Sequence, residues 1–169
     1  ISKSIFPQSN GINQTLFLDQ DRNLLPGHSF TYTFEVSGNN AFDATLSWND
    51  REGSASADQN ISRLVNNLDL VVTSPSGEQF NGNDFANGFS QSNGIIDVLN
   101  NLERVRIAST EPGIWTIKIG HSGGFSQDFS LVVSSNAIEL QEADLTVVPN
   151  SIFSSETGPL KGDTISIQL

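Results

Sequence analysis

Apolar and polar residues alternate along most of this chain, and this alternation is what most constrains the fold. The clearest case is residues 29–36, with the sequence Ser-Phe-Thr-Tyr-Thr-Phe-Glu-Val. Successive side chains of a β-strand point to opposite faces, so the pattern predicts a strand with one buried face. The same parity recurs in residues 44–48, 68–72, 115–119 and 129–133.

These runs end in residues that favour turns, such as Ser37-Gly38-Asn39-Asn40 and Glu111-Pro112-Gly113. Weaker runs at 14–19, 78–80 and 103–107 raise the expected number of strands to about eight, and no segment has a convincing helical period. The sequence therefore predicts an all-β fold, an antiparallel jelly-roll β-sandwich. Two polar loops, 49–62 and 81–99, are expected between strands, and loops of such length are often functional.

The alternation stops at residues 134–136 and resumes near Asp144. We therefore expect a jelly roll over residues 1–136 and a linker over 137–143. Residues 144–169 would be a short β appendage, the start of a truncated second β domain. The alternative is that these last strands pack on the first sandwich. Because the chain contains no Met and opens with Ile, we expect it to be a piece of a longer polypeptide.

The acidic composition disfavours several classes of partner. The chain has 8 Lys and Arg against 19 Asp and Glu, a formal net charge of −11. Such a charge repels nucleic-acid phosphates and anionic lipid headgroups, so we expect no nucleic-acid partner. No apolar run approaches the roughly 18 residues that span a bilayer, so no membrane insertion is expected. The absence of Cys excludes disulfides and thiolate metal sites.

One motif imitates a catalytic site. Gly120-His121-Ser122-Gly123-Gly124 fits the Gly-x-Ser-x-Gly pattern of a nucleophile elbow. An elbow needs a helix after the Ser and a His later in the chain, whereas here a strand follows and no downstream His exists. We expect a hairpin turn. The two histidines, His28 and His121, are too few for a zinc site of three His ligands, so no catalytic residue is predicted.

Acid and amide side chains are concentrated where loops meet strands, and such oxygen ligands from several segments suit calcium. The candidate ligands of a structural calcium ion are Asp50, Asn66, Asn67, Asp69, Asn83 and Asp84. The alternative is that these loops are solvated and bind no metal. Glu103 shares parity with the apolar Val105 and Ile107. If it leans inward it needs a partner or a cation, unless it lies at an exposed strand end.

Several segments, taken in order, carry a family resemblance. They are residues 46–50 (Leu-Ser-Trp-Asn-Asp), 64–72 (Leu-Val-Asn-Asn-Leu-Asp-Leu-Val-Val), 74–77, 82–85, 100–103, 112–117 (Pro-Gly-Ile-Trp-Thr-Ile) and 127–131. In this order they resemble the C-terminal β-sandwich of bacterial subtilisin-like (subtilase) serine proteases, over about residues 15–134. At Asn67 the family usually has Asp, which weakens a calcium site that depends on this side chain. Residues 143–147 and 161–165 resemble the opening of immunoglobulin-like adhesion repeats.

The resemblance implies a non-catalytic domain of a secreted, extracellular subtilisin-like serine endopeptidase. The subtilase catalytic signatures are missing from this sequence, so the catalytic domain would lie before Ile1. This chain would stabilise that catalytic domain and help to bind protein substrates. The alternative is a carbohydrate- or surface-binding jelly-roll module. Trp48 and Trp115 sit at core parity, so that alternative depends on exposed aromatic rings at Phe85 and Phe89.

Overall fold

The structure, a computed structural model, describes residues 15–53, 55, 62–135 and 138–146. This part contains ten strands, and no helix in it is long and apolar enough to cross a membrane. The strands are β1 (Thr15–Leu24), β2 (Ser29–Val36), β3 (Phe42–Trp48), β4 (Asn67–Thr73), β5 (Gln79–Ala86), β6 (Phe89–Ser92), β7 (Leu102–Ile107), β8 (Gly113–Gly123), β9 (Gln127–Ser135) and β10 (Ile138–Thr146).

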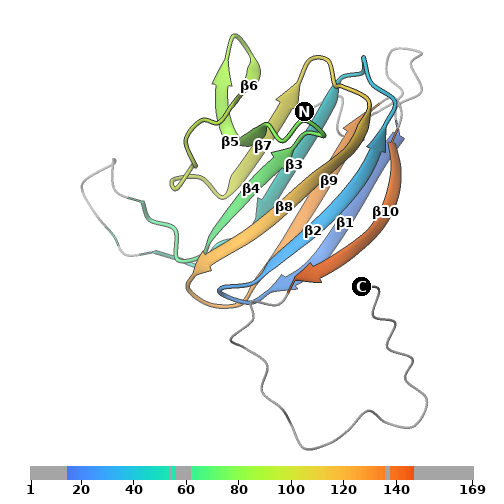
Figure 1. The fold of residues 1–169 in the computed structure, drawn as a ribbon. Coiled ribbons are helices and arrows are strands. Elements are labelled where there is room, and N and C mark those ends of the chain that lie inside the picture. The colour runs from blue at the N-terminus through green and yellow to red at the C-terminus, as the bar shows by residue number, and fades with distance from the viewer. Residues whose placement is uncertain (1–14, 54, 56–61, 136–137, 147–169) are drawn as a thin grey trace, which may run out of the picture.

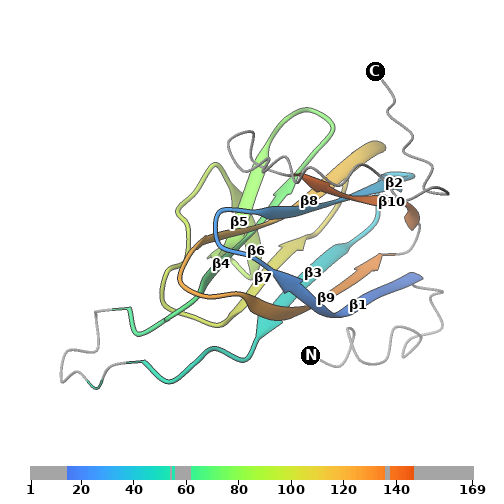
Figure 2. The same ribbon diagram turned by 90° about the horizontal axis from the view of Figure 1, so that it is seen from below.

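The strands form two sheets that face each other as two layers (Figures 1 and 2). One sheet has the order β1-β9-β3-β7 and the other has the order β10-β2-β8-β4-β5-β6. Within them β1 pairs with β9, β2 with β8, β3 with β7 and β4 with β5, always antiparallel. The first strands of the chain thus pair with the last ones, and the later pairs lie between them in the sequence. Successive pairs belong to alternate sheets, which is the jelly-roll arrangement. The all-β jelly-roll prediction is confirmed, with β6 and β10 added to its eight strands.

The core lies between the two sheets and is formed by the apolar side of each alternating strand. On β2, the side chains of Tyr32, Phe34 and Val36 are at most 1% exposed, whereas Glu35 between them is exposed. The rings of Phe42 on β3 and Trp115 on β8 stack at 5.8 Å and join the two layers. Burial of each such side chain contributes about 1.5–3 kcal/mol. The apolar faces that the alternation predicts are therefore the main source of the stability of the fold.

The predicted loop 81–99 is partly wrong, because it contains most of β5 and all of β6. These strands form a hairpin around Asn87 and Gly88, which have φ values of 53° and 84°. Two consecutive residues in the left-handed region form the tight turn that matches the twist of a β-hairpin. In Figure 1 this hairpin projects from one end of the six-stranded sheet.

At the other edge of that sheet, β10 pairs with β2, in a register that runs from Ile138 opposite Val36 to Thr146 opposite Ser29. Residues 138–143 of the expected linker are therefore strand. This is the pairing expected if the last strands pack on the first sandwich. Residues 147–169 lie outside the described part of the chain, so the second domain at 144–169 remains a prediction.

Candidate functional site

The six predicted calcium ligands lie in three separate settings. Asp50 and Asn66 belong to the loops beside β3 and β4, and Asp84 fastens the loop after β6. The other three, Asn67, Asp69 and Asn83, lie around two acidic side chains outside the predicted ligand set, Asp97 and Glu103. This last group is called the acidic cluster below.

In the first setting the polar oxygens are already occupied. The Asp50 carboxylate accepts hydrogen bonds from the backbone N–H groups of Val65 at 2.7 Å and Asn66 at 3.0 Å. Asn66 is fully buried, and its Oδ1 accepts a hydrogen bond from the N–H of Phe125 while its Nδ2 donates to Gln127. Buried backbone donors need such partners. These two side chains therefore organise the loops.

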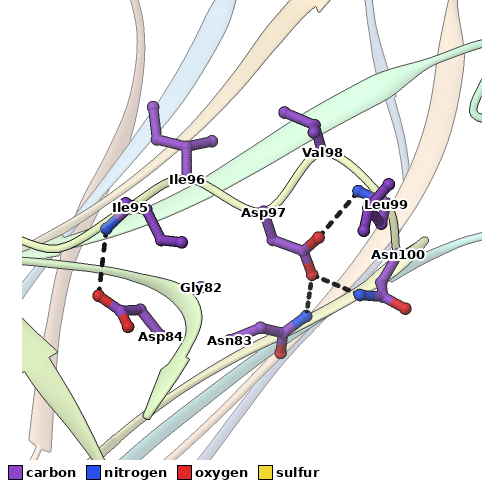
Figure 3. A pocket seen from close by; sticks show the side chains of 9 residues that line it. All are labelled: Gly82, Asn83, Asp84, Ile95, Ile96, Asp97, Val98, Leu99 and Asn100. Carbon is purple, nitrogen blue, oxygen red and sulfur yellow. Dashed lines mark hydrogen bonds between the residues drawn. The ribbon is translucent and has the colours of Figure 1, made fainter. Parts of the chain in front are cut away.

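Asp84 has a similar structural task in the second setting. Its Oδ2 accepts a hydrogen bond from the N–H of Ile95 at 3.1 Å (Figure 3). Its Oδ1 accepts one from Gln91 Nε2 at 3.3 Å. The carboxylate lies so close to Gly94 that a Cβ atom at residue 94 would overlap it. Asp84 thus holds the start of the loop between β6 and β7 against β5.

Asn83 and Asp97 hold the middle of the same loop (Figure 3). Asn83 has a φ of 61°, and its Nδ2 donates to Asp97 Oδ2 at 2.6 Å and to the carbonyl of Leu102 at 2.7 Å. Asp97 also accepts hydrogen bonds from Asn100 Nδ2 and from the N–H of Leu99. Burial opposes ionisation of Asp97, but these hydrogen bonds outweigh it and lower its pKa.

A cavity of about 370 Å³ lies over this loop and the adjoining part of β5. Its lining combines Asn83, Asp84 and Asp97 with apolar residues of the loop. In Figure 3 the side chains of Ile96 and Val98 point away from the Asp97 carboxylate. The loop therefore has a polar side that is bonded to β5 and an apolar side that is exposed to solvent.

Glu103 lies beneath this region, on β7, and is only 1% exposed. Its Oε2 accepts a hydrogen bond from the N–H of Leu70 on β4 at 2.7 Å. β4 and β5 pair only from Val71 to Thr73, so Leu70 lies just beyond the paired residues, and the Glu103 carboxyl supplies an acceptor for its N–H. A Cβ atom at Gly82 would overlap this carboxyl group, so the close approach of β5 requires glycine there.

The three carboxyl groups of the acidic cluster repel one another. Burial raises the pKa of Glu103 to about 8; the hydrogen bond from Leu70 opposes this shift, and Asp69 and Asp97 add to it. Burial and the charge of Asp97 also raise the pKa of Asp69, against a hydrogen bond from Asn67 Nδ2 at 2.9 Å. Within the described part of the chain, none of these three carboxyl groups forms an ion pair with a Lys or Arg side chain. The acidic partners in the ion pairs of Arg22, Arg104 and Arg106 are Asp19 and Asp43.

Two buried oxygens of this region lack a partner among the described residues: Glu103 Oε1 and Asn67 Oδ1. Oxygen atoms alone suit a hard cation such as Ca²⁺ rather than zinc. In the described ranges, however, no three His, Cys, Asp or Glu side chains are grouped as ligands of one metal ion. A cation here would therefore depend on amide oxygens and water as well as carboxylates. In the sequence, Glu103 could be noticed because it shares the alternation of the apolar Val105 and Ile107. No local pattern singled out Asp97.

The elbow-like motif has no catalytic geometry. His121 is 3% exposed, and burial lowers its pKa, whereas the neighbouring Ser122 is exposed. The Ser122 hydroxyl donates to the carbonyl of Asn67 at 3.2 Å, and neither ring nitrogen of His121 has a partner among the described residues. Both residues lie at the end of β8. The segment after Gly123 leads to β9, which belongs to the other sheet and does not pair with β8, so the expected hairpin is wrong.

Neither protein-family models nor curated proteins match this sequence. The likeness to subtilase β-sandwiches therefore rests on the ordered segments quoted above. Two of them include the end of β3 and all of β4 except its last residue, Thr73, and these strands lie beside the loops just described.

Proposed function

We propose that this chain is a non-catalytic domain that stabilises a secreted subtilisin-like serine protease by packing against its catalytic domain. The supporting observation is a concentration of exposed apolar side chains at one end of the sandwich. Among the residues whose burial the structure describes, seven of the eleven exposed large apolar residues lie between residues 85 and 102: Phe85, Phe89, Ile95, Ile96, Val98, Leu99 and Leu102. We call them the apolar end. Exposed apolar side chains concentrated in one region of a protein commonly mark a site of protein interaction.

Hydrogen bonds order the loop that carries much of the apolar end. Two hydrogen bonds join the loop between β6 and β7 to β5: the Ile95 N–H donates to Asp84, and Asn83 donates to Asp97. Asp97 also accepts bonds from Leu99 and Asn100 within the loop. A surface that is already ordered loses less conformational entropy when a partner docks. This favours an interface with a neighbouring folded domain, and the resemblance identifies that neighbour as the protease catalytic domain. Binding of large protein substrates across the two domains would be a secondary role.

The first test is the reading frame that encodes this chain. The proposal requires a subtilase catalytic domain upstream of Ile1, and a frame without one would refute it. The second test is the half-life of that protease at elevated temperature. Ile96→Ser combined with Val98→Ser should shorten it, because both side chains are exposed and belong to the apolar end. Leu25→Ser is the matched control, since Leu25 is also exposed but lies between β1 and β2.

A carbohydrate-binding module is the second candidate, because Phe85 and Phe89 are 40% and 39% exposed. The hairpin register pairs Phe85 with Ser90 and Ala86 with Phe89. Directly paired residues share a face, so the two rings lie on opposite faces and form no coplanar platform. The guanidinium of Arg106 also lies 5.1 Å from the centre of the Phe89 ring. Glycan-array binding that is lost in Phe85→Ala would establish this candidate over the first.

A further inference from the structure

β7 is an edge strand, and one side of its backbone faces away from the rest of its sheet. In the four-stranded sheet it pairs with β3 alone. The register of the two strands runs without a shift from Leu102 to Ile107. In an antiparallel pair, alternate residues turn their N–H and C=O groups toward the partner strand, and the residues between them turn these groups away. A regular free edge of this kind can pair with a strand from another molecule.

Side chains of the β5–β6 hairpin occupy this edge. Asn83 on β5 donates through Nδ2 to the C=O of Leu102 at 2.7 Å and accepts the N–H of Arg104 through Oδ1 at 3.0 Å. Two residues further along β7, the N–H of Arg106 donates to the hydroxyl of Ser90 on β6 at 2.9 Å. These groups belong to alternate residues of β7, so they are the ones that face away from β3. The hairpin is part of the other sheet and lies beside β7 (Figure 1).

The Asn83 amide takes the place of a backbone peptide group. In a parallel pairing, one residue of the added strand donates its N–H to a C=O of the edge strand and accepts the N–H from two residues further on. The Asn83 amide makes the same two bonds, to Leu102 and Arg104. Asn83 has a φ of 61°, in the left-handed region that Asn adopts more readily than most residues. The backbone conformation and the side chain at residue 83 therefore both suit a cap for β7.

The other edge strands are protected in different ways. β1 and β10 each contain a register shift, and β6 has four residues. Bulges and short strands both discourage the addition of a further strand. β7, in contrast, has six residues in unbroken register with β3. Its arginines, Arg104 and Arg106, are both paired with Asp43, at 2.7 and 3.9 Å, so their charge is partly neutralised and repels an added strand less. Protection of this edge therefore depends on the hairpin.

We propose that the β5–β6 hairpin is a cap that prevents a second copy of this chain from adding to the four-stranded sheet through β7. A second copy is the partner that is always present, and two β7 strands can pair about a twofold axis because each offers the same free edge. Such pairing would join the two four-stranded sheets into one continuous sheet. The inference rests on the bonds of Asn83 and Ser90 to β7, and it holds whichever parent protein contains the chain.

The experiment removes the capping groups and keeps the backbone of the hairpin. Asn83→Gly places at this position a residue that tolerates a positive φ, and Ser90→Ala removes only the hydroxyl. In the double variant, the Kd of self-association measured by sedimentation equilibrium should fall at least about tenfold below that of the unsubstituted chain. In dilute solution, hydrogen exchange at the Arg104 and Arg106 amides should become at least about tenfold faster.

The matched control is Asn87→Gly combined with Ser92→Ala. Asn87 also has a positive φ, of 53°, and both residues are exposed on the same hairpin. The control should keep the Kd of self-association and the exchange rates of the unsubstituted chain.

A proline in β7 shows whether association uses this edge. Arg106→Pro, added to the double variant, removes the outward N–H that a pairing strand needs, and proline is tolerated on the free side of an edge strand. It should restore the Kd of the unsubstituted chain. Asn83→Gly also removes the bond to Asp97, so association through a loosened loop is the rival explanation. That association would persist in Arg106→Pro.

Two results would overturn the inference. One is a double variant whose self-association equals that of the unsubstituted chain. The other is increased self-association that Arg106→Pro leaves in place. If the double variant fails to fold, Ser90→Ala alone decides the question, because it keeps the bonds of Asn83. Its Kd should fall by a smaller factor, which Arg106→Pro should reverse, and an unchanged Kd would overturn the inference. A subtilase-free reading frame would refute the proposed function and leave these measurements unaffected.

Discussion

Glu103 and Leu70 are joined by a hydrogen bond of 2.7 Å that crosses from the four-stranded to the six-stranded sheet. The rest of the interior between these sheets is packed mainly by apolar side chains. The carboxyl group therefore connects the two layers at the place where β5 leaves β4. Its protonation links the stability of the fold to pH.

In EGTA, the stability of the chain should fall as pH rises from about 4.5 to about 8. The pKa of Glu103 is raised from 4.5 to about 8 in the folded state, so folding favours the protonated form. The resulting stabilisation is fully present below the unfolded pKa and is lost as pH rises through the folded one. The slope contributed by Glu103 is at most about 1.4 kcal/mol per pH unit.

Urea unfolding across this range would measure that slope. Glu103→Gln should remove the contribution, and Glu78→Gln, at an exposed position, should leave it in place. Because Asp69 and Asp97 also titrate, the relevant quantity is the difference between the unsubstituted chain and Glu103→Gln. If stability changes with pH by the same slope in these two proteins, then titration of Glu103 does not cause the pH dependence.

Gly82→Ala should destabilise the chain by about 1–3 kcal/mol, because the added methyl group overlaps the Glu103 carboxyl in a packed interior. Gly120→Ala is the control, since a Cβ atom there meets nothing within 4 Å. Equilibrium denaturation of both proteins gives the comparison. If Gly82→Ala is as stable as Gly120→Ala, then β5 is not held against Glu103 as described.

Asp50→Ala should cost about 1–3 kcal/mol, because it leaves the N–H groups of Val65 and Asn66 without their acceptors. Glu52→Ala, two residues away and exposed, should change the free energy of unfolding by less than about 0.5 kcal/mol. If Asp50→Ala is as stable as Glu52→Ala, then the Asp50 carboxylate does not hold these two N–H groups.

The chain should not hydrolyse peptide or ester substrates, because the described residues place no base within hydrogen-bond distance of Ser122, and His121 is buried on the other face of β8. Assays with chromogenic esters and peptides check this expectation. Any turnover by a purified sample should be the same in Ser122→Ala. Turnover that this substitution abolishes would make Ser122 a nucleophile.

The strands were predictable because their signal is local. Parity alone places Tyr32, Phe34 and Val36 in the core, and it also marked Glu103 as inward-facing. The hairpin of β5 and β6 was missed, although Asn87-Gly88 is a strong hairpin turn signal. Its flanking residues do not alternate clearly between apolar and polar.

The candidate site was predictable only in part, because its chemistry depends on partners far apart in sequence. Asp50 and Asp69 look equivalent in the sequence, since each lies in an oxygen-rich segment near a strand. Asp50 is bonded to two N–H groups 15 and 16 residues away, whereas Asp69 lies near the carboxyl groups of Asp97 and Glu103. Which oxygens remain free follows from loop conformation, and no spacing rule encodes it.

The position of the late strands has a consequence for synthesis. β9 lies between β1 and β3, and β8 lies between β2 and β4, so each sheet is completed by a strand from the end of the jelly roll. Until β9 has left the ribosome, the earlier strands of its sheet lack their central hydrogen-bonding partner. Such non-local pairing slows folding and leaves strand edges open to aggregation. Nascent chains that end before residue 127 should therefore need chaperone protection, and release of β9 should be the step that permits folding.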